Sequence, residues 1–186
     1  MNIFYLHNDP TKCAEMHNNS HCVKMILESA QLLSTAHRIL DGVESIGTSQ
    51  SGRKKKVWKL ADERLDSQLY SATHINHPSA IWVRQSKANY NWLALLLANL
   101  CSEYTHRYGK IHKCQQSGLV ALLMTVAPKN ISNDPFTEPT PAMPDIYKVV
   151  NDSVLSYHNY YNGAKTHLAK WTNRNIPEWF DAKLCI

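Results

Sequence analysis

One acid, Glu28, lies among bases and amides in the stretch 17–40, HNNSHCVKMILESAQLLSTAHRIL. A carboxylate between bases can move protons or stabilise a cationic intermediate while the bases hold phosphates. If the stretch is helical, polar residues spaced three or four apart share one stripe opposite an apolar one. That stripe comprises His21, Lys24, Glu28, Gln31, Thr35 and Arg38. The alternative is a solvated helix face, on which Lys24 and Glu28 form an ordinary ion pair.

A second cluster near the start of the chain could bind a metal. Cys13 and His17 are four residues apart, as are His17 and His21, and Cys22 follows. However, the residues HNNS are expected to interrupt the helix, and the spacing matches no standard zinc pattern. We therefore predict neither a metal nor another cofactor, and keep a Cys/His metalloprotein as a third hypothesis. The five cysteines are widely spread without a CxxC pair, which is typical of reduced thiols.

Basic segments elsewhere in the chain could contact an anionic backbone. GRKKKVWK carries the densest positive charge, HPSAIWVR places bases around a predicted helix start, and EYTHRYGK combines bases with tyrosines. A helix start offers free N–H groups to an anion, and aromatic rings can stack on nucleobases. Each segment could equally be a solvated loop, an ordinary helix cap or a packed helix face. As nucleic-acid contacts we predict Lys24, Arg38, Arg53, Lys54, Lys55, Lys56, His77, Arg84, His106, Arg107 and Lys110.

Length and composition predict one globular domain. The chain has 186 residues, of which 44% are hydrophobic and 19% are charged. Its formal net charge of +5 favours an anionic partner. The first ten residues, MNIFYLHNDP, have no signal-peptide pattern. The longest apolar run is WLALLLANLC, which is too short to span a bilayer. We therefore expect a cytoplasmic protein. P-loop, dinucleotide-binding, zincin and α/β-hydrolase motifs are absent from the sequence.

Apolar spacing and capping residues predict an all-α fold, a single compact helical domain over residues 1–186. NIFYL should be a short strand or an N-terminal extended arm, followed by a helix that Asp9 caps and Pro10 begins. Further helices are predicted over 23–40, from a cap at Ser79 to a stop at Gly109, over 118–127, and from a cap at Asp145. A basic loop at about 42–60 and a long Pro-rich surface loop at about 127–145 connect them.

The order of these segments resembles that of the pyrimidine dimer DNA glycosylases with AP-lyase activity, the phage endonuclease V family. In HCVKMILE a His precedes a Glu by seven residues, and GRKKKVWK, NHPSAIW and YHNYYNGAK follow in the family order. The resemblance covers about residues 1–165. It implies a small, basic, all-helical domain whose N-terminal segment inserts between helices.

The resemblance also implies a mechanism. In the family, the α-amino group of the first residue attacks C1′ of the damaged nucleotide, forms an imine as the base leaves, and promotes strand cleavage by β-elimination. An α-amino group suits this step because, unlike a lysine side chain, it is partly unprotonated at neutral pH. Met1 would supply the amine, Glu28 would stabilise positive charge and move protons, and His21 would complete the motif.

Two features depart from the family pattern. The family removes Met before a small residue, whereas the bulky Asn2 should leave Met1 in place, and the insertion at about 41–52 enlarges the family core. We predict an N-glycosylase, with or without AP-lyase activity, acting on damaged or modified pyrimidines in DNA, with duplex DNA as the expected partner. No obligate protein partner is evident, and a viral protein of this kind would act in the host cytoplasm. The alternatives are a non-catalytic nucleic-acid-binding phage protein on the same scaffold and a nucleotide- or base-modifying enzyme.

Overall fold

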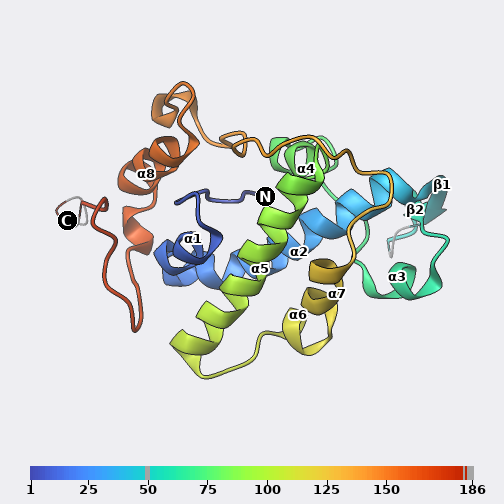
Figure 1. Cartoon of the computed structure of the whole chain (residues 1–186), viewed down its shortest axis with the longest axis horizontal. Helices are drawn as coiled ribbons and strands as arrows, with labels where there is room; N and C mark the ends of the chain where they lie inside the picture. Colours follow the sequence, from blue (N-terminus) through green and yellow to red (C-terminus); the bar gives the residue numbers. More distant parts are fainter. Residues whose placement is uncertain (49–50, 182, 184–186) are drawn as a thin grey trace.

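Two antiparallel helices form the centre of the structure. The computed structural model describes residues 1–48, 51–181 and 183. Helices α2 (Asn19–Asp41) and α5 (Lys87–Tyr108) cross in the middle of the molecule (Figure 1). His37 near the end of α2 bonds the Tyr90 hydroxyl near the start of α5, at 2.9 Å, which is consistent with helices that run in opposite directions. Fully buried apolar side chains from both helices form the core.

Shorter helices surround this pair. They are α1 (Pro10–Met16), α3 (Glu63–Gln68), α4 (Pro78–Val83), α6 (Lys113–Gln116), α7 (Leu119–Thr125) and α8 (Ser153–Ala164), with 3₁₀ turns η1 (Asp145–Tyr147) and η2 (Thr166–Leu168). As predicted, Asp9 caps α1 and Pro10 begins it. The predicted break at HNNS is also confirmed, because α1 ends at Met16 and Asn18 caps α2. Across the described ranges, no helix combines the length and apolar character needed to cross a bilayer.

The helix expected from Ser79 to Tyr108 is divided in two, so that prediction was wrong. His77, not Ser79, caps α4, and its ring nitrogen Nδ1 accepts a hydrogen bond from the Ser79 N–H at 3.2 Å. At Ser86 the backbone becomes extended and the hydroxyl accepts from the Asn89 N–H at 3.1 Å, which begins α5 as a new helix. A serine at this position competes with the preceding helix because its side chain satisfies the free N–H groups of the next one.

The all-α prediction is also wrong, because Val43–Thr48 and Lys54–Lys59 form a two-stranded β-hairpin where a basic loop was predicted. Strands β1 (Val43–Thr48) and β2 (Lys54–Lys59) pair antiparallel, with Val43 opposite Lys59 and Thr48 opposite Lys54. The hairpin projects from the end of α2 at one extremity of the molecule (Figure 1). The β-branched residues of β1 and the adjacent Val57 and Trp58 of β2 favour strands, but neither segment shows the regular polar–apolar alternation by which a strand is recognised in a sequence.

The Pro-rich segment has no helix or strand from 126 to 144, as predicted for a surface loop. Side chains of the helices satisfy its backbone: Trp82 donates to the Thr137 carbonyl at 2.9 Å, and Ser153 donates to the Pro139 carbonyl at 2.9 Å. The helix expected from Asp145 is limited to the turn η1, and α8 begins later, at Ser153, with Asp152 as its cap. That boundary was therefore predicted wrongly.

The first residues form an extended arm inside the protein. Ile3, Tyr5 and Leu6 are almost completely buried, and the arm forms no strand pairing. The Cys13 thiol of α1 donates to the Phe4 carbonyl at 3.4 Å and accepts from the Leu6 N–H at 3.4 Å. The arm therefore belongs to the hydrophobic core and holds the start of the chain in one place.

Candidate active site

The candidate site is centred on the Glu28 carboxylate, which faces the start of the chain. The backbone N–H of Asn2 donates to Glu28 Oε2 at 2.9 Å. The other oxygen, Oε1, lies 3.4 Å from Lys24 Nζ. The Glu28 side chain is 13% exposed, whereas that of Lys24 is 67% exposed. The Glu28 side chain is therefore mostly shielded from water, with a small part of its surface exposed.

The side chain of Asn2 fixes the direction of this N–H. Its Oδ1 accepts a hydrogen bond from the Tyr157 hydroxyl of α8 at 2.6 Å, and also from the Ile3 N–H at 2.8 Å. Its Nδ2 donates to the carbonyl of Ala142, in the Pro-rich loop, at 2.9 Å. Asn2 is only 8% exposed, so these bonds are screened from water. Two distant segments, α8 and the Pro-rich loop, thus hold Asn2 in place beside Glu28.

His77 belongs to the same electrostatic neighbourhood. Burial lowers its pKa, the positive charges of the Met1 α-amino group and of His74 lower it further, and the Glu28 carboxylate raises it. Because Nδ1 of His77 accepts the Ser79 N–H, the neutral ring carries its proton on Nε2. The structure therefore brings the sequence-predicted residues Met1, Glu28, Lys24 and His77 to one region.

His21, predicted as catalytic, has a packing role in the structure. Its ring stacks on Phe4 at a centroid separation of 3.9 Å, and Nδ1 lies 2.6 Å from the Tyr161 hydroxyl. Burial lowers its pKa to about 3, with further lowering by His17, so the ring is neutral at physiological pH. His21 precedes Glu28 by two helical turns, about 10 Å along α2. It holds the N-terminal arm that presents Asn2 to Glu28.

The stripe predicted on α2 is not a solvated polar face. His21, Thr35 and Arg38 are buried, while Val23 and Leu27, expected on the apolar side, are 39% and 41% exposed. The helix is covered on most sides by neighbours, which include the arm and the segment 69–73. Of the stripe, Lys24 is the charged residue whose side chain extends into solvent.

Two of the predicted phosphate contacts, Arg38 and Arg84, bond to the protein itself. Arg38 donates, at 2.6–2.8 Å, to the carbonyls of Trp58, Asp66, Leu69 and Tyr70 and to the Asp66 carboxylate. These bonds use all the N–H directions of its guanidinium group. Arg84 donates from Nη1 to the carbonyls of Ile75 and Ala80, at 2.7 and 3.0 Å. Both guanidinium groups are bonded to the protein's own backbone, so neither is well placed to bind a phosphate.

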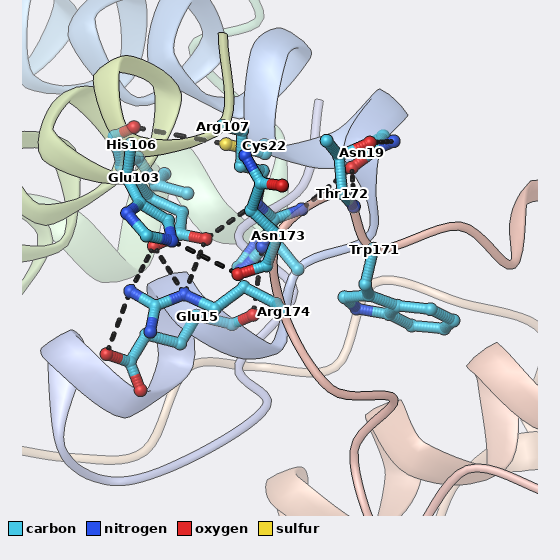
Figure 2. A network of polar contacts seen from close by, with 12 residues as sticks. Glu15, Asn19, Cys22, Glu103, His106, Arg107, Trp171, Thr172, Asn173 and Arg174 are labelled. Atoms are coloured by element: carbon cyan, nitrogen blue, oxygen red, sulfur yellow. Dashed lines mark hydrogen bonds and ion pairs between the residues drawn. The ribbon is translucent and has the colours of Figure 1, made fainter. Parts of the chain in front are cut away.

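Arg107 lies in a buried ionic network at the other end of α5 (Figure 2). Glu103 Oε1 accepts from Arg107 Nε at 2.6 Å, and Glu103 Oε2 accepts from Arg174 Nη2 at 2.8 Å. Arg174 also pairs with Glu15 of α1 at 3.2 Å. The network joins α1, α5 and the C-terminal segment, so Arg107 has an internal partner.

The remaining predicted contacts are exposed but lie in separate places. His106 Nε2 donates a hydrogen bond to the Asn173 carbonyl at 3.1 Å, at the edge of the ionic network. Lys110 borders a shallow pocket with Tyr104 and Tyr108. The run Arg53, Lys54, Lys55 and Lys56 lies on the hairpin and is exposed. No hydrogen bond or ion pair between described residues links these groups to Glu28, and only their charge relates them to an anionic partner.

The four residues considered for a metal do not converge. The Cys13 thiol donates to Phe4, the Cys22 thiol lies 4.0 Å from the Leu100 carbonyl, and His17 Nδ1 lies 2.7 Å from the Cys13 carbonyl. No group of three or more His, Cys, Asp or Glu in the described ranges has metal-binding geometry. Burial raises the pKa of the Cys13 thiol to about 12, which disfavours the thiolate that a metal requires.

Sequence reasoning missed the groups that orient Asn2. Tyr157 enters the sequence analysis only as part of the segment YHNYYNGAK, and Ala142 lies in a segment without regular structure. The contact between Asn2 and Tyr157 joins residues 155 positions apart, and no local pattern reports such a pairing. Comparisons with known protein families, curated proteins and solved structures find no match to this chain.

Proposed function

We propose that this protein is a DNA N-glycosylase with AP-lyase activity, acting on damaged or modified pyrimidines. The observation that carries the proposal is the 2.9 Å contact between the Asn2 nitrogen and the Glu28 carboxylate, beside the Met1 α-amino group. The chemistry requires an amine and a carboxylate at one sugar carbon. The amine is the α-amino group of the first residue: that of Met1 as the sequence is written, or that of Asn2 if Met1 is removed.

The proposed reaction uses the carboxylate in each step. The amine nitrogen forms a bond to C1′ while the base leaves with the electron pair of the glycosidic bond. Glu28 takes a proton from the nitrogen after the bond has formed and gives it to O4′ as the C1′–O4′ bond breaks, which opens the sugar ring and leaves the nitrogen as a protonated imine. Removal of a C2′ proton expels the 3′ phosphate by β-elimination, and water finally hydrolyses the imine. If Met1 is removed, the reacting nitrogen is that of Asn2, and a carboxylate 2.9 Å away can stabilise the positive charge on it.

Lys24 and His77 are suited to bind the phosphates next to the reacting sugar. Lys24 lies 3.4 Å from Glu28 and extends into solvent from the same helix, and His77 is close enough for the Glu28 carboxylate to raise its pKa. A lysine contact with a phosphate positions the strand without reading its sequence. The choice of lesion would then depend on the surface around Glu28 and not on these two residues.

Trapping with borohydride on abasic and dimer-containing duplex DNA tests the proposal. Borohydride reduces the imine to a stable amine, so we expect a covalent adduct for the wild-type chain and a loss of at least about 100-fold in its rate of formation for Glu28→Gln. Glu63→Gln is the matched control, because it makes the same change at an exposed carboxylate outside the site. Mass spectrometry of the adduct identifies whether Met1 or Asn2 carries the sugar.

A second candidate, a non-catalytic nucleic-acid-binding protein on this scaffold, is favoured by one observation. With Met1 in place, the nitrogen at Glu28 belongs to a peptide bond and is not nucleophilic. Binding of abasic duplex DNA without any adduct at several pH values would support this candidate and refute the lyase proposal.

A further inference from the structure

The net positive charge of the chain is concentrated in the hairpin. Residues 43–59 contain five bases and a single acid, so this segment carries four of the five net positive charges of the protein. The acid, Glu44, pairs with Lys56 at 2.8 Å. Lys54 and Lys55 have no ion pair in the described part of the chain. A local charge of this size creates a positive potential at one end of the molecule.

The root of the hairpin is firmly anchored, whereas its two faces are open. At the root, Arg38 donates to the Trp58 carbonyl at 2.8 Å and the Asp66 carboxylate accepts from the Leu60 N–H at 2.9 Å. Val43 and Ile46 are 74% and 65% exposed, although strand residues of this type are normally covered. A two-stranded hairpin alone is only marginally stable in water. The anchoring therefore maintains a ribbon that covers no part of the core.

The lysines lie on both faces of the ribbon. Side chains alternate along a strand, so Lys55 and Lys59 occupy one face and Lys54 and Lys56 the other. Such an arrangement suits a partner that presents negative charge on two sides. The major groove of B-DNA is about 12 Å wide, admits a two-stranded ribbon and is bordered by a row of phosphates on each side. A flat anionic surface would meet the lysines of one face only.

A concave surface of about 310 Å³ lies at the base of the hairpin. Lys55, Lys56 and Lys59 line it, together with Ser71. The neighbouring Arg38 and Asp66 are engaged with each other at 2.7 Å, so the lysines supply its net charge. A phosphate group could enter this surface and meet the lysines and a hydroxyl.

We infer that the hairpin β1–β2 is an accessory arm that contacts the backbone of a DNA duplex beside the site of reaction. From Glu28 to the start of β1, helix α2 advances by about 20 Å, the length of about six base pairs. The hairpin would therefore hold the duplex roughly half a turn away from the nucleotide at Glu28. The inference depends on the proposed function for the position of the reacting nucleotide. The contribution of the hairpin to DNA affinity can nevertheless be measured without any reaction.

The test measures how the affinity for an undamaged duplex of about 30 base pairs depends on salt. Wild-type protein is compared with Lys54→Gln/Lys55→Gln/Lys59→Gln, which leaves the ion pair of Lys56 intact. A control with equal net charge, Lys12→Gln/Lys170→Gln/Lys183→Gln, neutralises exposed lysines elsewhere. Each lysine–phosphate contact contributes about 0.9 to the slope of log Kd against log salt. We expect the hairpin variant to lower the slope by about 2 to 3, and the control to lower it by less than 1.

Three outcomes would overturn the inference. The first is an unchanged salt slope in the hairpin variant. The second is an equal effect of the three hairpin substitutions on binding to single-stranded DNA of the same sequence. The third is hairpin-dependent binding to anionic phospholipid vesicles with no hairpin-dependent binding to the duplex. All the substituted positions are exposed, and thermal unfolding checks that the variants are folded. If the adduct forms while the slope stays constant, only the hairpin inference fails. If the slope falls but no adduct forms, only the catalytic proposal fails.

Discussion

Replacing Glu103 by Gln should destabilise the protein far more than the same change at Glu15. The Glu103 side chain is 3% exposed and Arg107 is 0% exposed, and Arg107 Nε lies 2.6 Å from Glu103 Oε1. Removing one partner of a buried ion pair leaves the other charge without compensation, at a cost of about 3–5 kcal/mol. The pair of Arg174 with Glu15 is 33% and 42% exposed, so its loss should cost less than about 1 kcal/mol.

Chemical and thermal unfolding measure this difference. For a chain of this size, about 3 kcal/mol corresponds to a decrease in Tm of about 6–12 °C. The double variant Glu103→Leu/Arg107→Met is informative, because replacing both partners by apolar groups often restores stability. It should recover much of the loss seen in Glu103→Gln. Equal losses in Glu103→Gln and Glu15→Gln would refute the reasoning, since burial would then have no influence on the pair.

The same network predicts a pH dependence with a defined sign. Burial alone would raise the pKa of Glu103, but the hydrogen bonds from Arg174 and Arg107 outweigh it and hold the pKa below its ordinary value of 4.5. A lowered carboxyl pKa stabilises the folded state above the unfolded pKa, and this stabilisation is lost as the pH falls through the folded pKa. The difference in unfolding free energy between wild type and Glu103→Gln should therefore decrease below about pH 4.5.

Two further predictions concern the interior. Burial lowers the pKa of His17 from 6.5 to about 4 and that of His21 to about 3, so both rings are neutral in the folded state near neutral pH. The unfolded chain binds these protons more readily, so the folded state should lose stability as the pH falls from about 6.5 toward 4. Urea unfolding midpoints that stay constant over this range would contradict the prediction. Arg38→Lys should destabilise the protein by about 3 kcal/mol, since a lysine cannot bond the four carbonyls and the Asp66 carboxylate together. Urea unfolding measures this cost. A loss below about 1 kcal/mol would show that the hairpin root does not depend on these bonds.

Local signals in the sequence were sufficient for several elements of the fold. Asp9 followed by Pro10 defines the start of α1 because both groups act within one turn. Gly109, with φ of 64°, ends α5 as predicted, since glycine adopts this left-handed conformation without strain. In contrast, Ser86 begins a second helix inside a continuous helical pattern, and only its extended backbone reveals it.

The candidate site was predictable only in part, for a physical reason. Glu28 and Lys24 are neighbours on one helix, so their proximity follows from helical spacing. The burial of Arg38 and Arg107 does not follow from spacing, because their partners come from distant segments. A basic residue in a sequence has the same appearance whether it binds a phosphate or a buried carbonyl. The burial of each side chain decides between the two.

The contact between Asn2 and Tyr157 has a consequence for the order of folding. Tyr157 is synthesised 155 positions after Asn2, so the two residues cannot meet until the chain between them has been made. Contacts of such long sequence separation slow folding because the loop must close before they form. Meanwhile the apolar arm, with Ile3 and Leu6, remains unburied until α1, α2 and α8 assemble around it. The geometry at Glu28 therefore depends on a contact that closes a loop of 155 positions.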